Sequence, residues 1–286
     1  MSEPRSGSQD EPASILTEVA DGVAVVRLNR PERLNALRNR DIVALSRTYA
    51  ELDADEEVRV IVVTGAGRAF CSGADLSRPG GAFQAPKKVR EYRSSPPRPL
   101  AFQIRKPVIA AINGHAIGLG MTLAMQCDIR FIAEEAKWGI VQVRRGVVPD
   151  AVSHWTLVRA VGTARAAEIL LSGDLFVGAE ALRLGVASKC LPADRVLDHA
   201  TGFARDMAVN GSPLSLAMSK HIIWAAADGD LARVDELESE AHRILMGRPD
   251  AIEGGTAAFQ KRQPAWESSV SRDWPDDGPF SRSATE

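Results

Sequence analysis

Residues 107–127 of the chain read PVIAAINGHAIGLGMTLAMQC and contain no Asp, Glu, Lys or Arg. The stretch is long enough to cross a membrane. However, Asn113, His115 and Gln126 would be costly in lipid, and three glycines would interrupt a single helix. The pattern instead predicts a buried strand over 108–112, a tight glycine-rich turn and a buried helix over 122–126. We therefore expect a folded domain and no membrane span.

A second strand followed by a glycine-containing turn lies upstream. Residues 58–63 read VRVIVV, and after residues 64–67 the chain continues as RAFCSGADL over 68–76. Each turn can aim a free backbone N–H at one site, and two such donors form an oxyanion hole for a carbonyl oxygen that gains negative charge. Each turn taken alone also fits a plain connection to a buried helix, because glycine-rich turns are common.

The elements around these turns change character near Ser153. Strands are predicted over 23–28 and 129–132, and a helix over 39–52. Beyond Ser153, alanine-rich helical patterns follow one another at 164–171, 179–184, 193–208, 214–227, 231–246 and 251–259. Strands with interleaved helices, followed by helices alone, indicate the α/β class.

This change divides the chain into four predicted parts. They are a disordered lead (1–13), a strand-rich core (14–200), a C-terminal helical region (201–262) and an irregular tail (263–286). The tail contains Trp266, Trp274 and Phe280, which are unusual in a loose segment. Packing against the body or against a neighbouring subunit therefore competes with free disorder.

Composition argues against several functions. The 286 residues include 35 basic and 37 acidic ones, for a formal net charge of -2, and only 5% are aromatic, so no nucleic-acid partner is expected. The three cysteines form no CxxC pair, and the five histidines are too dispersed for a local zinc motif, so we expect no metal. Residues 1–12 lack the apolar run of a signal peptide, and we expect a cytoplasmic protein.

Two common motifs fail on single residues. Residues 60–67 (VIVVTGAG) resemble the start of a nucleotide-binding unit, but Ala69 and Phe70 stand where glycine is required. Phe70 also breaks a GxSxG nucleophile motif around Ser72.

Several motifs, in order and at matching spacing, resemble those of the crotonase superfamily, the enoyl-CoA hydratase/isomerase family. They are LNRP at 28–31, LNAL at 34–37, AFCSGADL at 69–76, AAINGHAIGLG at 110–120, CDIR at 127–130, EG at 253–254 and KR at 261–262. The resemblance runs from about Val23 to Arg262. It implies an α/β fold, the crotonase (ClpP-like) spiral of ββα units, with a helical C-terminal trimerisation region. It also implies an acyl-CoA substrate, with coenzyme A as part of the substrate and no separate cofactor, and a homotrimer or hexamer.

The resemblance assigns roles to individual residues. The oxyanion hole would be formed by the backbone N–H groups of Ala74 and Leu119. The family often has glycine at the second position, and leucine would be costly there if its φ were positive. The residues expected to bind acyl-CoA are Arg33, Leu34, Ala69, Asp75, Leu76, Gly118, Thr122 and Lys261.

Among these residues, Arg33 and Leu34 match a segment along the adenine and pantetheine. Lys261 matches a basic residue near the CoA phosphates that typically reaches into a neighbouring subunit. A solvated charge at the end of a helix is an equally compatible interpretation of Lys261. Residues 76–99, which include a basic stretch, would line the acyl pocket or face the CoA.

The residues expected to perform the chemistry depart from the hydratase pattern. Hydratases of this family use two glutamates as general base and general acid, and these positions hold Thr122 and Gln142. Asp150 stands where related isomerases carry a proton-transferring acidic residue and where 4-chlorobenzoyl-CoA dehalogenase carries its nucleophilic aspartate. Asp150 is equally placed to cap a helix that starts near Ala151. His154, one helical turn further on, is placed to pair with Asp150.

We therefore predict an acyl-CoA enzyme of the hydratase/isomerase type that stabilises a thioester enolate. Double-bond isomerisation, or another reaction that depends on Asp150, is favoured over hydration, and Gln142 is expected to contact the substrate or a water. Two alternatives stay open. One is an enoyl-CoA hydratase, the family default, and the other is a non-catalytic acyl-CoA-binding protein.

Overall fold

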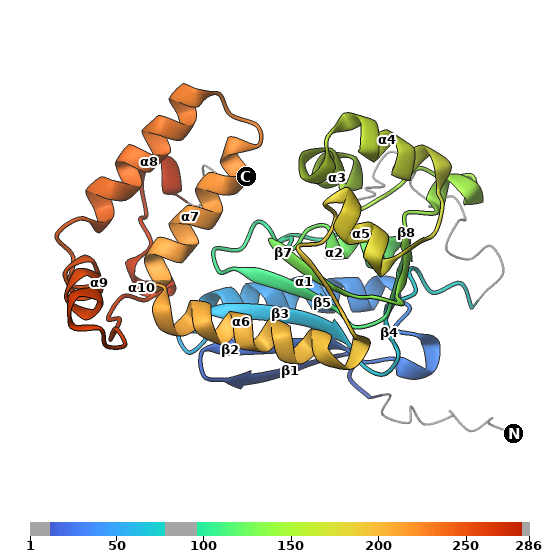
Figure 1. The fold of residues 1–286 in the computed structure, drawn as a ribbon, viewed down its shortest axis with the longest axis horizontal. Helices are drawn as coiled ribbons and strands as arrows, with labels where there is room; N and C mark the ends of the chain where they lie inside the picture. Colours follow the sequence, from blue (N-terminus) through green and yellow to red (C-terminus); the bar gives the residue numbers. More distant parts are fainter. Residues whose placement is uncertain (1–11, 78–95, 282–286) are drawn as a thin grey trace, which may run out of the picture.

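The computed structural model describes residues 12–77 and 96–281 and contains two β-sheets with helices around them (Figure 1). The larger sheet has the strand order β1-β2-β3-β5-β7-β10, and the smaller sheet has the order β4-β6-β8-β9. The strands are β1 (Ile15–Ala20), β2 (Val23–Leu28), β3 (Val60–Gly65), β4 (Ala69–Cys71), β5 (Val108–Ile112), β6 (His115–Ile117), β7 (Ile129–Ala133), β8 (Lys137–Gly139), β9 (Phe176–Val177) and β10 (Lys189–Leu191).

The centre of the larger sheet is buried on both faces. Every residue of β3 (VIVVTG) and of β5 (VIAAI) is buried, and both strands are paired in parallel with their neighbours. Such strands are apolar along their whole length, which is why they are recognisable in the sequence. The edge strand β1 was not predicted, because only its first residue is even partly buried and its pattern carries little signal.

Strands of the larger sheet continue into short strands of the smaller one. β3 leads into β4, β5 into β6 and β7 into β8, and β4, β6 and β8 pair in parallel in that same order. Gly65 and Gly114 stand at two of the corners, where an added Cβ would collide with the backbone of residues 68–70. This repeated strand–corner–strand arrangement is the predicted ββα spiral, and the α/β class is confirmed.

The helices form one group that lies around the sheets, α1 to α6, and a C-terminal group, α7 to α10 (Figure 1). They are α1 (Asn39–Ala54), α2 (Leu119–Ala124), α3 (Ser153–Val161), α4 (Thr163–Ser172), α5 (Gly178–Leu184), α6 (Val196–Asn210), α7 (Pro213–Ala226), α8 (Leu231–Leu245), α9 (Pro249–Gln260) and α10 (Val270–Asp273). Short 3-10 helices cover η1 (Pro31–Arg33), η4 (Gln142–Arg145), η5 (Ala193–Arg195) and η6 (Gly278–Phe280). Helices α7 to α10 project beyond the sheets at one end of the molecule (Figure 1).

Helix α6 belongs to the sheet-containing core. It packs on β2, β3 and β5 and carries Ala200, Ala204 and Ala208, which are one turn apart and at most 2% exposed (Figure 1). Small side chains on one face allow a helix to approach a sheet closely. The predicted boundary at 200/201 falls inside α6, so the core continues to Asn210.

The described part of the tail packs onto the C-terminal helices. Trp274 and Phe280 are buried in a hydrophobic cluster with side chains of α7 and α8. Trp266 Nε1 donates to the carbonyl of Val209 at 2.9 Å. Of the three predicted possibilities, namely packing on the body, packing on a neighbouring subunit and free disorder, the described residues show packing on the body. The tail also contains two short helical turns, α10 and η6, which were predicted as irregular.

The short strands β4, β6, β8, β9 and β10, of two or three residues each, were not predicted from the residue pattern either. Where an element was predicted, its bounds differ by a few residues. β3 begins at Val60, two residues later than predicted, and α2 begins at Leu119, three residues earlier. The predicted disordered lead lies almost entirely outside the described residues. Among the described helices, none is long and apolar enough to cross a membrane.

Candidate active site

The two glycine-containing turns lie against each other. Gly73, which follows β4, has a φ of 105°, a conformation that other residues rarely adopt. A Cβ placed on Gly73 would lie 2.8 Å from the carbonyl oxygen of Ile117 and 3.7 Å from the backbone nitrogen of Leu119. Glycine is therefore required for the turn after β4 to approach the turn before α2 this closely.

The backbone N–H of Ala74 is left free by the hydrogen bonds on either side of it. Leu37 N–H donates to the carbonyl of Gly73 at 2.8 Å, and Asp75 N–H donates to the carbonyl of Leu37 at 2.9 Å. Leu37 and Ala74 thereby form an isolated parallel bridge. Within the described backbone, the N–H of Ala74 itself has no acceptor.

Leu119 is the first residue of α2, and the residue before it, Gly118, has a φ of 54°. Leu119 itself is not among the residues with positive φ, so the strain expected for leucine at this position does not arise. Its N–H belongs to the first turn of a helix, where N–H groups lack intrahelical partners and the dipole is positive. No backbone acceptor for it is found among the residues of the two described ranges. The two predicted donors are therefore free and lie on adjacent turns.

The carboxyl group of Asp150 is held by the residues at the two expected glutamate positions. Thr122 Oγ1 donates to Asp150 Oδ1 at 2.9 Å, and Gln142 Nε2 donates to the same oxygen at 3.0 Å. Thr122 is fully buried and Gln142 is 7% exposed. No other described residue donates a hydrogen bond to Asp150 Oδ2, and this oxygen is not completely buried.

Two predictions about the surroundings of Asp150 are wrong. Helix α3 starts at Ser153, with Val152 as the N-cap residue and no side-chain cap, so Asp150 does not cap it. His154 is exposed, and the carboxyl bonds of Asp150 go to Thr122 and Gln142 instead.

The physical reason lies in the backbone that follows Asp150. Ala151 and Val152 have φ values of 52° and 57°, a conformation that is unfavourable for residues with a Cβ and especially for valine. Gln126 Nε2 donates to the carbonyl of Ala151 at 3.0 Å and helps to hold this segment. The strained turn separates Asp150 from α3, so a helix-based pattern cannot describe its contacts.

Burial raises the pKa of the Asp150 carboxyl above its usual value, and the hydrogen bonds from Thr122 and Gln142 oppose part of this rise. A carboxyl with a raised pKa is a stronger base when ionised and holds a proton at higher pH. Both properties suit a group that takes up a proton and returns it.

The amide of Gln142 lies beside the turn that carries Leu119. Its Cδ, Nε2 and Oε1 atoms would each lie 3.9 Å from a Cβ placed on Gly118. Gln142 Oε1 is buried and has no hydrogen-bond partner among the described residues. The contacts of Gln142 thus join Asp150 to the oxyanion turn in one site. The predicted contact of Gln142 with substrate or water stays a prediction.

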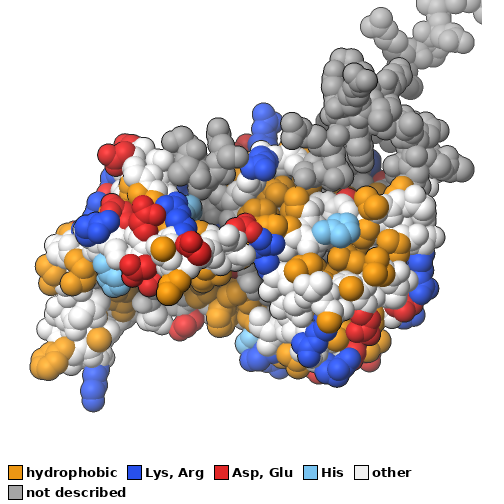
Figure 2. All heavy atoms as spheres, turned by 90° about the horizontal axis from the view of Figure 1, so that it is seen from above, with side chains coloured by type: hydrophobic (Ala, Val, Ile, Leu, Met, Phe, Trp, Pro, Cys, Tyr) orange, Lys and Arg blue, Asp and Glu red, His pale blue; other side chains and the backbone are white. Residues whose placement is uncertain are grey.

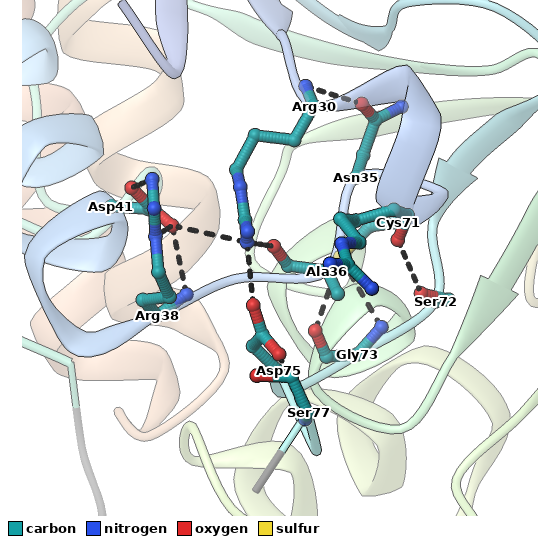
Figure 3. A network of polar contacts seen from close by, with 11 residues as sticks. Arg30, Asn35, Ala36, Arg38, Asp41, Cys71, Ser72, Gly73, Asp75 and Ser77 are labelled. Atoms are coloured by element: carbon teal, nitrogen blue, oxygen red, sulfur yellow. Dashed lines mark hydrogen bonds and ion pairs between the residues drawn. The ribbon is translucent and has the colours of Figure 1, made fainter. Parts of the chain in front are cut away.

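Arg30, to which the sequence motifs assigned no role, connects the Ala74 turn to the segment before α1 (Figure 3). Arg30 Nη1 donates to Asp75 Oδ2 at 2.8 Å and to the carbonyl of Ala36 at 2.6 Å. The hydrogen bond from Arg30 is the main reason why the pKa of Asp75 falls to about 2. Asp75, predicted to bind acyl-CoA, therefore has an internal partner and is ionised at neutral pH.

The other predicted contact residues are not all brought together. Arg33 and Leu34 lie beside the Ala74 turn, because Ser72 N–H donates to the carbonyl of Leu34 at 2.9 Å. Arg33 is exposed, Leu34 is half-buried and Leu76 is 41% exposed. Ala69 is only 1% exposed within β4, so its side chain faces the interior.

Lys261 is the C-cap residue that follows α9, and it is exposed. Figure 1 places α9 at the opposite end of the molecule from α3 and α4, so a single chain does not bring Lys261 to the site. Most of the predicted pocket-lining segment 76–99 also lies outside the described residues, at 78–95. Within the described ranges, no group of three or more His, Cys, Asp or Glu side chains is arranged to hold a metal ion.

The fold agrees with comparisons to known proteins. A family model described as enoyl-CoA hydratase/isomerase matches residues 18–269, and the chain belongs to this family. A solved structure of a probable enoyl-CoA hydratase/isomerase from Mycobacterium abscessus is 46% identical with a TM-score of 0.86, covering 89% of this chain and 99% of that one.

Relatives with lower identity agree. The solved structure of an enoyl-CoA hydratase from Bacillus anthracis is 28% identical with a TM-score of 0.81, over 89% of this chain and 99% of that chain. A probable mitochondrial enoyl-CoA hydratase of Dictyostelium discoideum is 34% identical over 250 residues, which cover 87% of this chain and 89% of that protein. The crotonase fold is confirmed, and membership of the family supports an enzyme of the hydratase/isomerase type.

Proposed function

We propose that this chain is an enzyme that acts on acyl-CoA thioesters and uses Asp150 to move a proton between two carbon atoms of the acyl group. The observation that carries the proposal is the carboxyl group of Asp150. Its Oδ1 is held by Thr122 and Gln142, while Oδ2 accepts no hydrogen bond from another described residue and is not completely buried. A fixed carboxyl with one free oxygen is suited to removing and returning a proton.

In the proposed reaction, Asp150 Oδ2 removes a proton from the carbon next to the thioester carbonyl of a 3-enoyl-CoA. The electron pair of the broken C–H bond forms a dienolate, and the negative charge on the thioester oxygen is stabilised by the N–H groups of Ala74 and Leu119. Asp150 then returns the proton to carbon 4, and the electrons move back to give the 2-enoyl-CoA. One proton and one double bond have moved, and the carboxylate is regenerated.

Hydration is the second candidate, because relatives at 32–35% identity are named enoyl-CoA hydratases. Addition of water needs a base for the water and an acid for the carbon, and the family pattern supplies both with glutamates. The hydroxyl of Thr122 and the amide of Gln142 do not exchange protons as carboxylates do. This difference favours isomerisation over hydration.

The test compares isomerisation of a 3-enoyl-CoA with hydration of crotonyl-CoA by the same purified protein. We expect isomerisation that is lost in Asp150→Asn and only slow hydration. Full isomerase activity in Asp150→Asn would refute the role of Asp150, and rapid hydration would support the hydratase instead. Binding of acyl-CoA without turnover of either substrate, unchanged by Asp150→Asn, would support the non-catalytic alternative.

We further propose that the chain assembles as a homotrimer or hexamer in which Lys261 reaches the CoA phosphates of a neighbouring subunit. Exposed apolar side chains on the C-terminal helices support assembly, with Ile223 68%, Phe259 91% and Ile252 63% exposed. Figure 2 shows hydrophobic side chains spread over the face that it views, including the left end, where Figure 1 places the C-terminal helices. Light scattering tests the assembly, and a raised KM in Lys261→Ala tests the contact. Arg33 and Leu34 as CoA contacts, and the cytoplasmic location, stay predictions.

A further inference from the structure

We infer that Arg30 is a positioning residue for the oxyanion hole, because its guanidinium joins the two backbone segments around the Ala74 N–H and neutralises the adjacent carboxylate of Asp75. This inference rests on the proposed function, since it takes the Ala74 N–H as a donor to the enolate.

One nitrogen of Arg30 contacts both sides of the bridge that holds Ala74. Arg30 Nη1 donates to the carbonyl of Ala36, the residue before Leu37, and to Oδ2 of Asp75, the residue after Ala74. Leu37 and Ala74 are themselves the two members of the parallel bridge. Any shift of Asp75 relative to Ala36 would therefore stretch these bonds and turn the peptide that carries the Ala74 N–H.

The backbone of Arg30 is itself held in place (Figure 3). Arg30 N–H donates to Asn35 Oδ1 at 2.9 Å. Asn35 is 1% exposed, and its Nδ2 donates to the carbonyls of Ala66 at 2.9 Å and Ala69 at 2.7 Å. Asn35 thus ties the start of the Arg30 side chain to β4 and to the turn before it, so the guanidinium acts from a rigid base.

The charge of Arg30 matters because of where the carboxylate of Asp75 lies. The side chains of Arg30 and Asp75 are 12% and 11% exposed, so water screens their charges only partly. Asp75 directly follows the residue whose N–H would hold the enolate. An unpaired carboxylate there would repel the developing negative charge, and Arg30 removes that repulsion.

Arg30 Nε is buried and has no acceptor among the described residues. A buried N–H without a partner is unfavourable. The guanidinium is therefore oriented by the bonds of Nη1 to Asp75 in the Ala74 turn and to Ala36 before α1, although this orientation leaves another donor unused. An unfavourable buried group of this kind is expected where the orientation of the side chain is needed for function, even at a cost in folding stability.

The experiment uses acetoacetyl-CoA, whose enolate absorbs in the near ultraviolet, so that enolate stabilisation is read without turnover. The variant Arg30→Met removes the guanidinium. The matched control is Arg47→Met, because the side chain of Arg47 is 80% exposed on α1. We expect Arg30→Met to weaken the enolate band and to lower kcat for the 3-enoyl-CoA about 10- to 100-fold, with little change in KM, since the loss of an oxyanion donor costs about 10²- to 10³-fold.

A second substitution separates charge from position. In Arg30→Met/Asp75→Asn the unpaired carboxylate is gone, so we expect part of the enolate band to return. Equal bands in the single and double variants would refute the role of charge. A normal band and a normal kcat in Arg30→Met would refute the inference as a whole.

A further variant and the unmodified protein distinguish failure of the Arg30 inference from failure of the proposed function. If Arg30→Met does not fold, Arg30→Gln decides, because glutamine loses both the charge and the reach of the guanidinium; a normal enolate band and a normal kcat in that variant overturn the inference. If the unmodified protein shows no enolate band, the oxyanion hole of the proposed function fails first. A band that is present and indifferent to Arg30 leaves the proposed function intact and refutes only the role of Arg30.

Discussion

The substitution Asp150→Asn separates proton transfer from side-chain position. Asparagine has nearly the same shape as aspartate, and its oxygen can still accept the hydrogen bonds that Thr122 and Gln142 give to Oδ1 at 2.9 Å and 3.0 Å. The oxygen that takes up the proton is lost. General acid–base catalysis contributes about 10²- to 10⁴-fold, so kcat for the 3-enoyl-CoA should fall by that factor. KM should change little, because thioester recognition by Ala74 and Leu119 is unaltered.

The same substitution should stabilise the fold at neutral pH. Burial raises the pKa of Asp150 above its usual value of 3.8. Between 3.8 and the raised pKa, the folded chain binds more protons than the unfolded chain, so the free energy of unfolding falls as the pH rises through this window and stays lower above it. Asparagine does not ionise, so the variant lacks this loss.

Two assays check both parts of the prediction. Initial rates with the 3-enoyl-CoA give kcat and KM, and denaturant unfolding above and below the window gives the pH-dependent stability. Asp174→Asn is a matched control, because the side chain of Asp174 is 51% exposed in a surface ion pair with Arg144. Wild-type kcat in Asp150→Asn, or a variant that is less stable at neutral pH, would show that the reasoning is wrong.

Three further predictions follow from hydrogen bonds and burial elsewhere in the chain. Thr122→Val removes a donor to Asp150 at constant volume, so the pKa of Asp150 should rise and the acidic limb of the kcat–pH profile should move to higher pH. Thr122→Ser keeps the hydroxyl and should keep the profile. An acidic limb that does not move in the valine variant would contradict this prediction. Burial opposes ionisation of Asp250, but hydrogen bonds from Ser268, Glu267 and Ser212 outweigh it and lower the pKa. The stabilisation is therefore present above the usual value of 3.8 and lost at lower pH. Asp250→Ala should cost about 2 kcal/mol in urea unfolding at neutral pH and almost nothing in strong acid. Burial lowers the pKa of His221 below 6.5, so the unfolded chain takes up the proton first and stability should fall as the pH drops below 6.5; His221→Phe should flatten that dependence in thermal unfolding.

The oxyanion turns are examples of what local sequence predicts well. Gly73 and Gly118 both carry positive φ values in the structure, and each follows a short apolar strand. Glycine is enriched at positions with positive φ because it lacks a Cβ, so a glycine in the sequence predicts this backbone conformation. The buried strands β3 and β5 are predictable for a similar reason, since burial on both faces requires continuous apolar runs.

Asp150 shows where local reasoning ends. Its position in the chain predicts a helix cap or a pairing with His154, and neither is present. The reason is that Ala151 and Val152 adopt left-handed conformations, which alanine and valine rarely do and which their identity therefore does not predict. The partners that it has instead, Thr122 and Gln142, come from α2 and η4. Their residue types were visible in the sequence, but their convergence on one carboxyl oxygen was not.

The α/β class, the central buried strands, the two glycine-containing turns and the family were therefore predictable from the amino-acid sequence. Each of these is encoded by short-range patterns of apolar residues and glycine that act through backbone geometry. The bonds of Thr122 and Gln142 to Asp150, and the pairing of Arg30 with Asp75, 45 residues away, are seen only in the folded chain. Contacts of this kind depend on how the ββα units pack on one another, because packing sets which distant side chains meet and no local spacing records it.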